Sequence, residues 1–246
     1  MRSRDGDDQE YVVSVDLSIC VNVKKGGYRP KSAFLLTSCL NQFNVEGKIV
    51  LDLGCGETGI IAHYALARGA KKVIGVDIDP SAIAHANRAS LASCKIMWVV
   101  SDLFGNLGKR KLDMIITNPP QMPMSDVDRT RLLDWHDTSG PTGRELILKT
   151  LEEGRSFLNP HGEIFLLVFD FLGVKKSFNS SPSLFEIAES LGYSCEVLEN
   201  YSRMVRLGGQ TAKNLAWINE VYPRYEFRRR GGNISYGVSV VRLKIQ

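Results

Sequence analysis

A glycine-rich turn between an apolar run and an amphipathic segment carries the strongest chemical signal in the sequence. Gly54, Gly56 and Gly59 follow the run Val50–Leu53, which predicts a strand that leads through a tight turn into a helix. Glycine lets the main chain approach a ligand closely, and the G-x-G-x-x-G spacing is typical of nucleotide sites. Taken alone the pattern is weak evidence, because it also fits the dinucleotide fingerprint. The turn predicts a nucleoside site that also includes Cys55.

Three carboxylates, each at the end of a predicted strand, narrow the choice of ligand. Asp77 lies 18 residues beyond Gly59, where a carboxylate can accept both hydroxyl protons of a ribose. Asp52 precedes the glycines, where a negative charge opposes a pyrophosphate but suits the sulfonium and ammonium groups of S-adenosylmethionine. Asp102 can accept a hydrogen bond from an adenine amino group, although an ordinary surface acid is an equal alternative. We expect this cofactor to contact Asp52, Gly54, Cys55, Gly56, Gly59, Asp77, Ile78, Ser101, Asp102, Leu103 and Asn118.

The fourth predicted strand ends in a run whose polar groups suit methyl transfer to nitrogen, Thr117-Asn118-Pro119-Pro120-Gln121. An amide or exocyclic amine nitrogen is a poor nucleophile because its lone pair is delocalised. The Asn118 side chain and the Pro119 carbonyl can accept its hydrogens, turn the lone pair toward the methyl carbon and stabilise the developing positive charge. We expect Asn118, Pro119 and Pro120 to be the catalytic residues, with no metal and no covalent nucleophile. The alternative is that the two prolines only end a strand.

With these motifs the sequence resembles class I S-adenosylmethionine-dependent methyltransferases that carry an Asn-Pro-Pro-aromatic motif. It is similar in particular to the short HemK-type protein glutamine methyltransferases, which lack a separate N-terminal helical domain. Ser139–Glu145, the turn Leu158–Gly162 and Tyr28-x-Pro30 carry this second similarity. It covers roughly residues 28–200 and implies a protein, peptide or small amide or amine as acceptor. In some organisms such enzymes work with a small activator subunit, which is a candidate partner here.

The sequence departs from that family in ways that bear on the acceptor. Gln121 stands where the family has an aromatic residue, which disfavours a flipped base because such sites depend on stacking. Thr58 stands where many relatives have their third glycine, and the connection 202–235 is longer than expected. The candidate acceptor contacts are Tyr28, Gln121, Trp135 and His136.

The elements that must position these residues alternate between β-branched runs and amphipathic segments, the pattern of parallel strands with helical crossovers. The fold class is therefore α/β, with the resemblance implying a seven-stranded Rossmann-like sheet, mostly parallel, with an antiparallel last strand and helices on both faces. The predicted strands are Lys48–Leu53, Lys72–Asp77, Lys95–Val100, Leu112–Thr117, Ile164–Phe169, Ser194–Glu199 and Tyr236–Ile245. The predicted helices are Pro30–Phe43, Thr58–Arg68, Ser81–Ala92, Arg144–Phe157, Ser183–Leu191 and Thr211–Val221.

The domain organisation predicted is a segment 1–27 with an edge strand or hairpin, then one methyltransferase domain over 28–246. Substrate-side insertions are expected at 121–143 and 202–235. The composition, with 43% hydrophobic residues and a net charge of +4, excludes disordered and collagen-like classes. Five scattered cysteines suggest neither a disulfide framework nor structural zinc. We expect a cytoplasmic protein, because neither a secretory signal nor a membrane-spanning run is recognisable.

The charge is distributed unevenly along the chain. Residues 201–246 hold nine Lys or Arg and two Asp or Glu, whereas residues 1–200 hold 22 and 25. The basic C-terminal region makes nucleic acid an alternative partner, and no membrane partner is expected.

The function predicted is transfer of a methyl group from S-adenosylmethionine to an amide or amine nitrogen of a protein or amino-acid-like acceptor, releasing S-adenosylhomocysteine. An exocyclic amine of RNA or DNA and a small biosynthetic metabolite are the alternative acceptors. Alternatives of another class are an NAD-dependent oxidoreductase and a non-catalytic cofactor-binding module.

Overall fold

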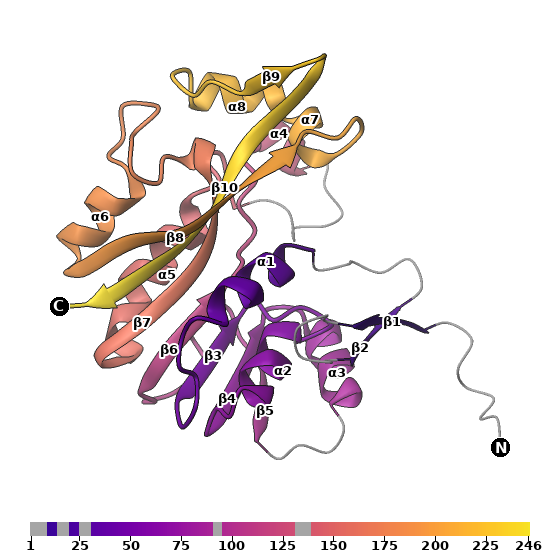
Figure 1. Ribbon diagram of the computed structural model, residues 1–246, viewed down its shortest axis with the longest axis vertical. Coiled ribbons are helices and arrows are strands. Elements are labelled where there is room, and N and C mark those ends of the chain that lie inside the picture. Colours follow the sequence, from indigo (N-terminus) through magenta and orange to yellow (C-terminus); the bar gives the residue numbers. More distant parts are fainter. Residues whose placement is uncertain (1–8, 14–19, 25–30, 91–94, 131–138) are drawn as a thin grey trace. The chain divides into compact units, whose positions relative to one another are not determined.

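The computed structural model describes residues 9–13, 20–24, 31–90, 95–130 and 139–246, and Figure 1 shows their elements. The chain separates into two compact units, Met1–Thr117 and Asn118–Gln246. The expectations for Tyr28, Trp135 and His136 lie outside the described residues.

A parallel sheet in the order β5-β4-β3-β6 forms the centre of the first unit. Its strands are β3 (Ile49–Leu53), β4 (Lys72–Asp77), β5 (Ile96–Val100) and β6 (Leu112–Thr117), each within one residue of its predicted bounds. Leu53 pairs in register with Val76 on one side and Thr117 on the other. Because the strands are parallel, the segments that follow them leave the sheet at one edge.

Helices pack on this sheet through small and apolar side chains. They are α1 (Lys31–Leu40), α2 (Ile60–Ala67) and α3 (Pro80–Ala89). Helix α2 packs on β3 and β4, α3 on β4 and β5, and α1 on α2. Helix α3 begins where the Asp79 side chain accepts the Ser81 N–H at 2.7 Å and Pro80 occupies the first turn. An antiparallel hairpin, β1 (Gln9–Val13) and β2 (Cys20–Lys24), lies in the predicted N-terminal segment.

The second unit is built on long antiparallel strands in the order β7-β10-β8. They are β7 (Leu158–Phe169), β8 (Tyr193–Met204) and β10 (Asn233–Ile245), and the short β9 (Arg228–Arg230) pairs with the start of β10. The helices are α4 (Asp126–Thr130), α5 (Glu145–Phe157), α6 (Leu184–Ser190), α7 (Gln210–Lys213) and α8 (Leu215–Val221), with the 3-10 turn η1 (Asp170–Leu172). Figure 1 shows α7, α8 and β9 around the end of β8 and the start of β10.

The α/β class and the antiparallel last strand are confirmed. Strand β9 is additional, so the described sheet strands outside the hairpin number eight rather than seven. The helix predicted over Thr211–Val221 was wrong in its continuity, since two short helices meet at Asn214. The Asn214 side chain donates to the Gln210 carbonyl at 2.9 Å, and such local bonds compete with helix continuation. Among the described residues no helix is long and apolar enough to cross a membrane.

Candidate active site

The glycine turn after β3 leaves open space beside its main chain. Gly54 and Gly56 have φ of 77° and 60°, and a Cβ at either would meet no atom within 4 Å. Two hydrogen bonds fix the turn to β4, because the N–H groups of Gly54 and Cys55 both donate to the Val76 carbonyl at 2.8 Å. Positive φ, not crowding, therefore requires glycine at positions 54 and 56. Between them, burial raises the pKa of the Cys55 thiol well above its ordinary value, and Asp52 adds to the shift.

The third glycine is required by a tryptophan that sequence analysis missed. Gly59 has φ of 51° at the start of α2, and a Cβ there would lie 2.2 Å from the Trp98 ring. Trp98 also lies against Gly75, its register partner on β4, where a Cβ would lie 2.3 Å from the ring. The indole N–H donates to the Ser90 Oγ at 3.0 Å. A glycine directly opposite a tryptophan on paired strands is the signal that could have revealed this packing.

Asp52 lies inside the first unit rather than on its surface. Its side chain is fully buried, and its Oδ2 accepts the Ala62 N–H at 2.8 Å, which caps the first turn of α2. Burial raises the pKa of this carboxyl from 3.8 to about 8, opposed by the Ala62 hydrogen bond and reinforced by Asp77. Its Oδ1 has no hydrogen-bond partner among the described residues. Because Asp52 is buried and holds its proton up to about pH 8, a cationic ligand would neither contact this carboxyl nor meet a negative charge there near neutral pH.

Asp77, the last residue of β4, links that strand to the glycine turn. Its Oδ2 accepts the Gly56 N–H at 2.8 Å and its Oδ1 accepts the Asp79 N–H at 3.0 Å. Each carboxylate oxygen keeps a second lone pair for a ligand hydroxyl. Ile78, the next residue, is 45% exposed, which is high for a large apolar side chain. An acceptor for hydroxyls and an exposed apolar side chain therefore stand beside the open turn.

The segment after β5 turns sharply. Leu103 has φ of 44°, a left-handed conformation that is uncommon for a residue other than glycine. Ser101 holds the turn, since its N–H donates to the Asp77 carbonyl at 2.9 Å and its Oγ accepts the Asn106 N–H at 2.9 Å. Asp102 is exposed between them. Backbone strain of this kind concentrates at binding sites.

These residues fit a nucleoside better than they fit a metal. The structure links Gly56, Asp77 and Ser101 by hydrogen bonds and leaves the turn, Ile78 and Asp102 open. Glu57, which sequence analysis did not single out, has a buried Oε1 with no hydrogen-bond partner in the described part of the chain. The same part contains no cluster of three His, Cys, Asp or Glu side chains suited to a metal ion.

The Asn-Pro-Pro motif begins the second unit. Asn118 is half-buried, and its side chain makes no hydrogen bond to the described residues; Pro119 is buried and Pro120 half-buried. Gln121 is 2% exposed and donates through Nε2 to the Leu167 carbonyl at 2.9 Å and to the Pro119 carbonyl at 3.3 Å.

The Oε1 of Gln121 accepts the Phe169 N–H at 2.7 Å, so all of its amide groups are used within the second unit. Gln121 therefore links the Asn-Pro-Pro motif to β7 by hydrogen bonds, and this buried position does not favour direct contact with an acceptor. Sequence analysis could not find this role, because its partners on β7 lie almost fifty residues further along the chain.

The segment 139–145 joins the motif to the 202–235 connection. A Cβ on Gly143 would lie 2.5 Å from the Gln121 carbonyl oxygen, so the two main chains touch there. From α8, the Trp217 Nε1 donates to the Pro141 carbonyl at 2.9 Å, and the hydroxyl of Tyr222, which ends the helix, donates to the Thr142 carbonyl at 2.7 Å. The long connection is thus fastened to the segment that supports the motif.

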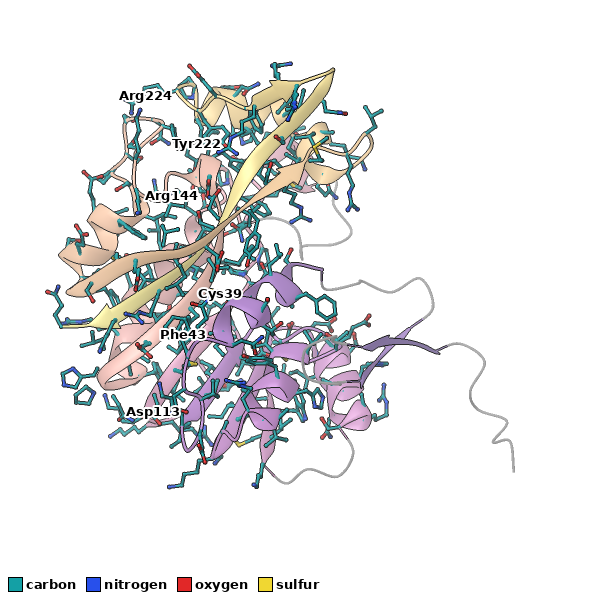
Figure 2. The ribbon with its side chains drawn as sticks, viewed as in Figure 1. Cys39, Phe43, Asp113, Arg144, Tyr222 and Arg224 are labelled. Carbon is teal, nitrogen blue, oxygen red and sulfur yellow. The ribbon has the colours of Figure 1, made fainter. Side chains whose placement is uncertain are left out.

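Arg144 and Glu145 make further hydrogen bonds next to this junction. Arg144 is 4% exposed and donates through Nη2 to the Pro182 carbonyl at 2.9 Å, and burial lowers its pKa. Glu145 accepts both the N–H and the hydroxyl of Thr142 at 2.9 Å. Burial raises the pKa of Tyr222 above its ordinary value, opposed by the Arg144 charge. Figure 2 labels Arg144 and Tyr222 within the second unit.

Comparison with known proteins identifies the class. A relative from Methanocaldococcus jannaschii, named "Putative protein N5-glutamine methyltransferase MJ0928", is 34% identical over 146 residues, which are 58% of this chain and 73% of the relative. The ribosomal protein L11 methyltransferase of Colwellia psychrerythraea is 42% identical over 105 residues, 41% of this chain and 34% of that enzyme. The chain is a class I S-adenosylmethionine-dependent methyltransferase.

More narrowly, the family described as methyltransferase small domain matches residues 30–133, and the chain belongs to it. Among solved structures, a T. thermophilus 16S rRNA N2 G1207 methyltransferase in complex with AdoMet and guanosine has a TM-score of 0.51 at 16% identity, covering 97% of this chain and 50% of the other. The ribosomal protein L11 methylase of Lactobacillus delbrueckii has a TM-score of 0.50 at 16% identity, covering 88% and 82%. At this identity the two structures support the fold alone.

Proposed function

We propose that the enzyme transfers a methyl group from S-adenosylmethionine to an amide or amine nitrogen of a protein or amino-acid-like acceptor. The observation that carries the proposal is Asn118, whose half-buried amide makes no hydrogen bond to the described residues. A buried polar side chain is normally hydrogen-bonded, so a half-buried amide without such a bond to the described residues is suited to a ligand. Accepting the hydrogens of a nitrogen is what its oxygen can do there.

The cofactor would be held by the first unit. The open turn at Gly54 and Gly56, the free lone pairs of Asp77 and the exposed Ile78 suit a ribose and an adenine. When bound, S-adenosylmethionine supplies an electrophilic methyl group on a sulfonium. A single peptide bond joins Thr117, at the end of β6, to Asn118. The unit that would hold the cofactor and the motif that would orient the acceptor are therefore consecutive in the chain.

The second unit would orient the acceptor. A carbonyl oxygen has two lone pairs, and the Gln121 bond at 3.3 Å occupies one at Pro119, leaving the other for an acceptor N–H. Because Gln121 also binds Leu167 and Phe169, the position of the Pro119 carbonyl is tied to β7. Fixed acceptors of this kind stabilise charge that develops in a transition state without reorganising first.

The absence of an aromatic side chain at position 121 bears on the type of acceptor. A flipped base needs an aromatic wall, and a buried glutamine amide provides none at this position. The name of the M. jannaschii relative, a protein N5-glutamine methyltransferase, agrees with an amide acceptor. An amide nitrogen of a protein is therefore the acceptor favoured here, and RNA, DNA and small metabolites are the competing outcomes of the test.

The first experiment is calorimetric titration of the purified chain with S-adenosylhomocysteine and, separately, with NAD. We expect binding of S-adenosylhomocysteine and no binding of NAD. The reverse result would refute the assignment of the cofactor and favour an oxidoreductase.

The second experiment follows labelled methyl transfer from S-adenosylmethionine into a fractionated lysate. We expect label in protein, in a form released as a methylated amide or amine. Asn118→Ala should reduce transfer about a hundredfold or more while retaining S-adenosylhomocysteine binding. The matched control Asn219→Ala changes an exposed asparagine of α8 and should retain full transfer. Label confined to nucleic acid or small molecules, or full activity of Asn118→Ala, would overturn the proposal.

A further inference from the structure

The end of the β8-β10-β9 ribbon carries an unusual concentration of arginine. Residues 202–235 contain six arginines and one lysine but only two glutamates. Five of the arginines lie in the paired strands or within two residues of them, and all five are exposed. We call this surface the arginine ribbon: Arg203, Arg206, Arg228, Arg229 and Arg230.

The register of the strands places no carboxylate opposite the arginines of β9. Arg228 lies opposite Ser235, whose partner on the far side is Met204, and Arg229 and Arg230 lie opposite Ile234 and Asn233. No carboxylate occupies these cross-strand positions, where an opposite charge would be stabilising. Arg206, Arg229 and Arg230 form no ion pair with any described residue. Uncompensated like charges at this spacing favour an anionic partner.

The arrangement fits a chain of phosphates better than an acidic peptide. Arginine presents a planar fork that pairs with phosphate through two hydrogen bonds, whereas lysine is a point charge. The register alternates these arginines between the two faces of the ribbon, with Arg203 and Arg229 on one face and Arg228 and Arg230 on the other. A partner that reaches all of them must therefore wrap the end of the ribbon, which a flexible phosphodiester chain can do. A peptide that extended the sheet beside β9 would run along Arg228–Arg230 alone and would not reach Arg203 or Arg206.

Two further features distinguish folded RNA from duplex DNA. Met204 is 49% exposed and Leu207 fully exposed, and apolar side chains beside exposed arginines suit the unstacked bases of RNA loops. The guanidinium carbon of Arg203 lies 5.7 Å from the centre of the Phe169 ring, a cation–π contact that restricts this side chain. The helices described in this connection, α7 and α8, are four and seven residues long, too short for a recognition helix in a DNA groove.

We propose that the arginine ribbon is a docking surface for the phosphodiester backbone and unpaired bases of a folded RNA. The surface belongs to the second unit, as does the Asn-Pro-Pro motif, and α8 fastens its connection to the segment that supports that motif. Docking there would bring an acceptor carried by an RNA or a ribonucleoprotein to the enzyme. The inference concerns docking and holds whichever nitrogen is methylated.

The test is fluorescence anisotropy of a labelled RNA hairpin with an unpaired loop, titrated with the full chain over a range of salt concentrations. The variant replaces Arg228, Arg229 and Arg230 by alanine. A control variant replaces three exposed lysines outside the ribbon, Lys109, Lys175 and Lys176, by alanine. It removes the same three positive charges. A third variant replaces the three β9 arginines by lysine. S-adenosylhomocysteine binding and circular dichroism confirm that each variant is folded.

We expect the alanine variant to bind the hairpin about tenfold more weakly or worse. Its plot of log K against log salt should become shallower by about 2, since each single-strand phosphate contact contributes about 0.7 to the slope. The lysine-removal control should match the native chain, and the arginine-to-lysine variant should retain the slope. Equal affinity for a DNA hairpin of the same sequence, stronger competition by polyglutamate than by RNA, or equal losses in the alanine variant and the control would each overturn the proposal.

Discussion

Replacing the buried carboxyl of Asp52 by an amide should remove a large pH dependence from the stability of the first unit. The folded protein keeps the Asp52 proton up to about pH 8, whereas an unfolded chain releases it near 3.8. Between these values folding therefore takes up a proton. The free energy of unfolding should fall as pH rises through this interval, by up to about 1.4 kcal/mol per pH unit. This contribution is fully present below pH 3.8 and lost above pH 8.

The magnitude is large compared with ordinary protein stability. Over the interval between 3.8 and about 8, the loss from Asp52 alone amounts to about 6 kcal/mol. Whole domains are stable by roughly 5–15 kcal/mol, so this one group should be visible above other titrations. Asp52→Asn retains an oxygen that can accept the Ala62 N–H and cannot ionise. Its free energy of unfolding should stay higher than that of the native chain near pH 8, and the difference should shrink toward pH 4.

Urea unfolding between pH 4 and pH 9, followed by far-ultraviolet circular dichroism, measures this difference directly. Asp52→Ala provides the control, because it removes both the ionisable group and the cap of α2. It should lack the same pH-dependent term as Asp52→Asn but be less stable at every pH, by about 1 kcal/mol or more for the cap. An unchanged pH dependence in Asp52→Asn would show that the buried carboxyl does not hold its proton, and would refute the reasoning.

Three further substitutions test the packing of the site by urea unfolding. Gly59→Ala should lower the free energy of unfolding by about 2–4 kcal/mol, since it combines left-handed strain with a clash against Trp98. The control Gly47→Ala, with positive φ in open space, should lower it by about 1–2 kcal/mol. Equal losses in the two variants would contradict the clash. Gln121→Leu should lower the free energy of unfolding by roughly 2–4 kcal/mol, because it leaves main-chain groups of β7 unpaired. Full native stability would argue against a stabilising link between Gln121 and β7. Tyr222→Phe should cost about 1–2 kcal/mol and leave S-adenosylhomocysteine binding unchanged, with weakened binding the contrary result.

Strands with strong boundaries could be predicted from the sequence, and strands created by pairing could not. Lys72–Asp77 and Leu112–Thr117 were predicted at their observed bounds, because polar or turn-forming residues flank each apolar run. Arg228–Arg230 has no apolar alternation, and its extended form comes from pairing with β10. The predicted turn around Asn159–Gly162 lies within β7, where His161 adopts a positive φ of 65°.

Within the site, the types of residue could be predicted but not the direction of each side chain. Asp77 lies beside the glycine turn as its spacing suggested, because adjacent parallel strands end together. Asp52 was recognised as a strand-end carboxylate, but its direction depends on the packing of α2 over β3. Gln121 was recognised as a missing aromatic and as a candidate acceptor contact, but its hydrogen bonds could not be predicted, since its partners come from a strand that follows much later in the chain.

The short, all-arginine strand β9 also has a consequence for solubility. An edge strand offers unpaired main-chain groups to other molecules, and natural proteins discourage such contacts with short strands and charged side chains. With three residues, all arginine, β9 pairs only with Asn233–Ser235 at the start of β10 and presents positive charge wherever a second copy would pair. The same arginines therefore disfavour pairing of two copies through β9, and their removal should increase self-association at high concentration.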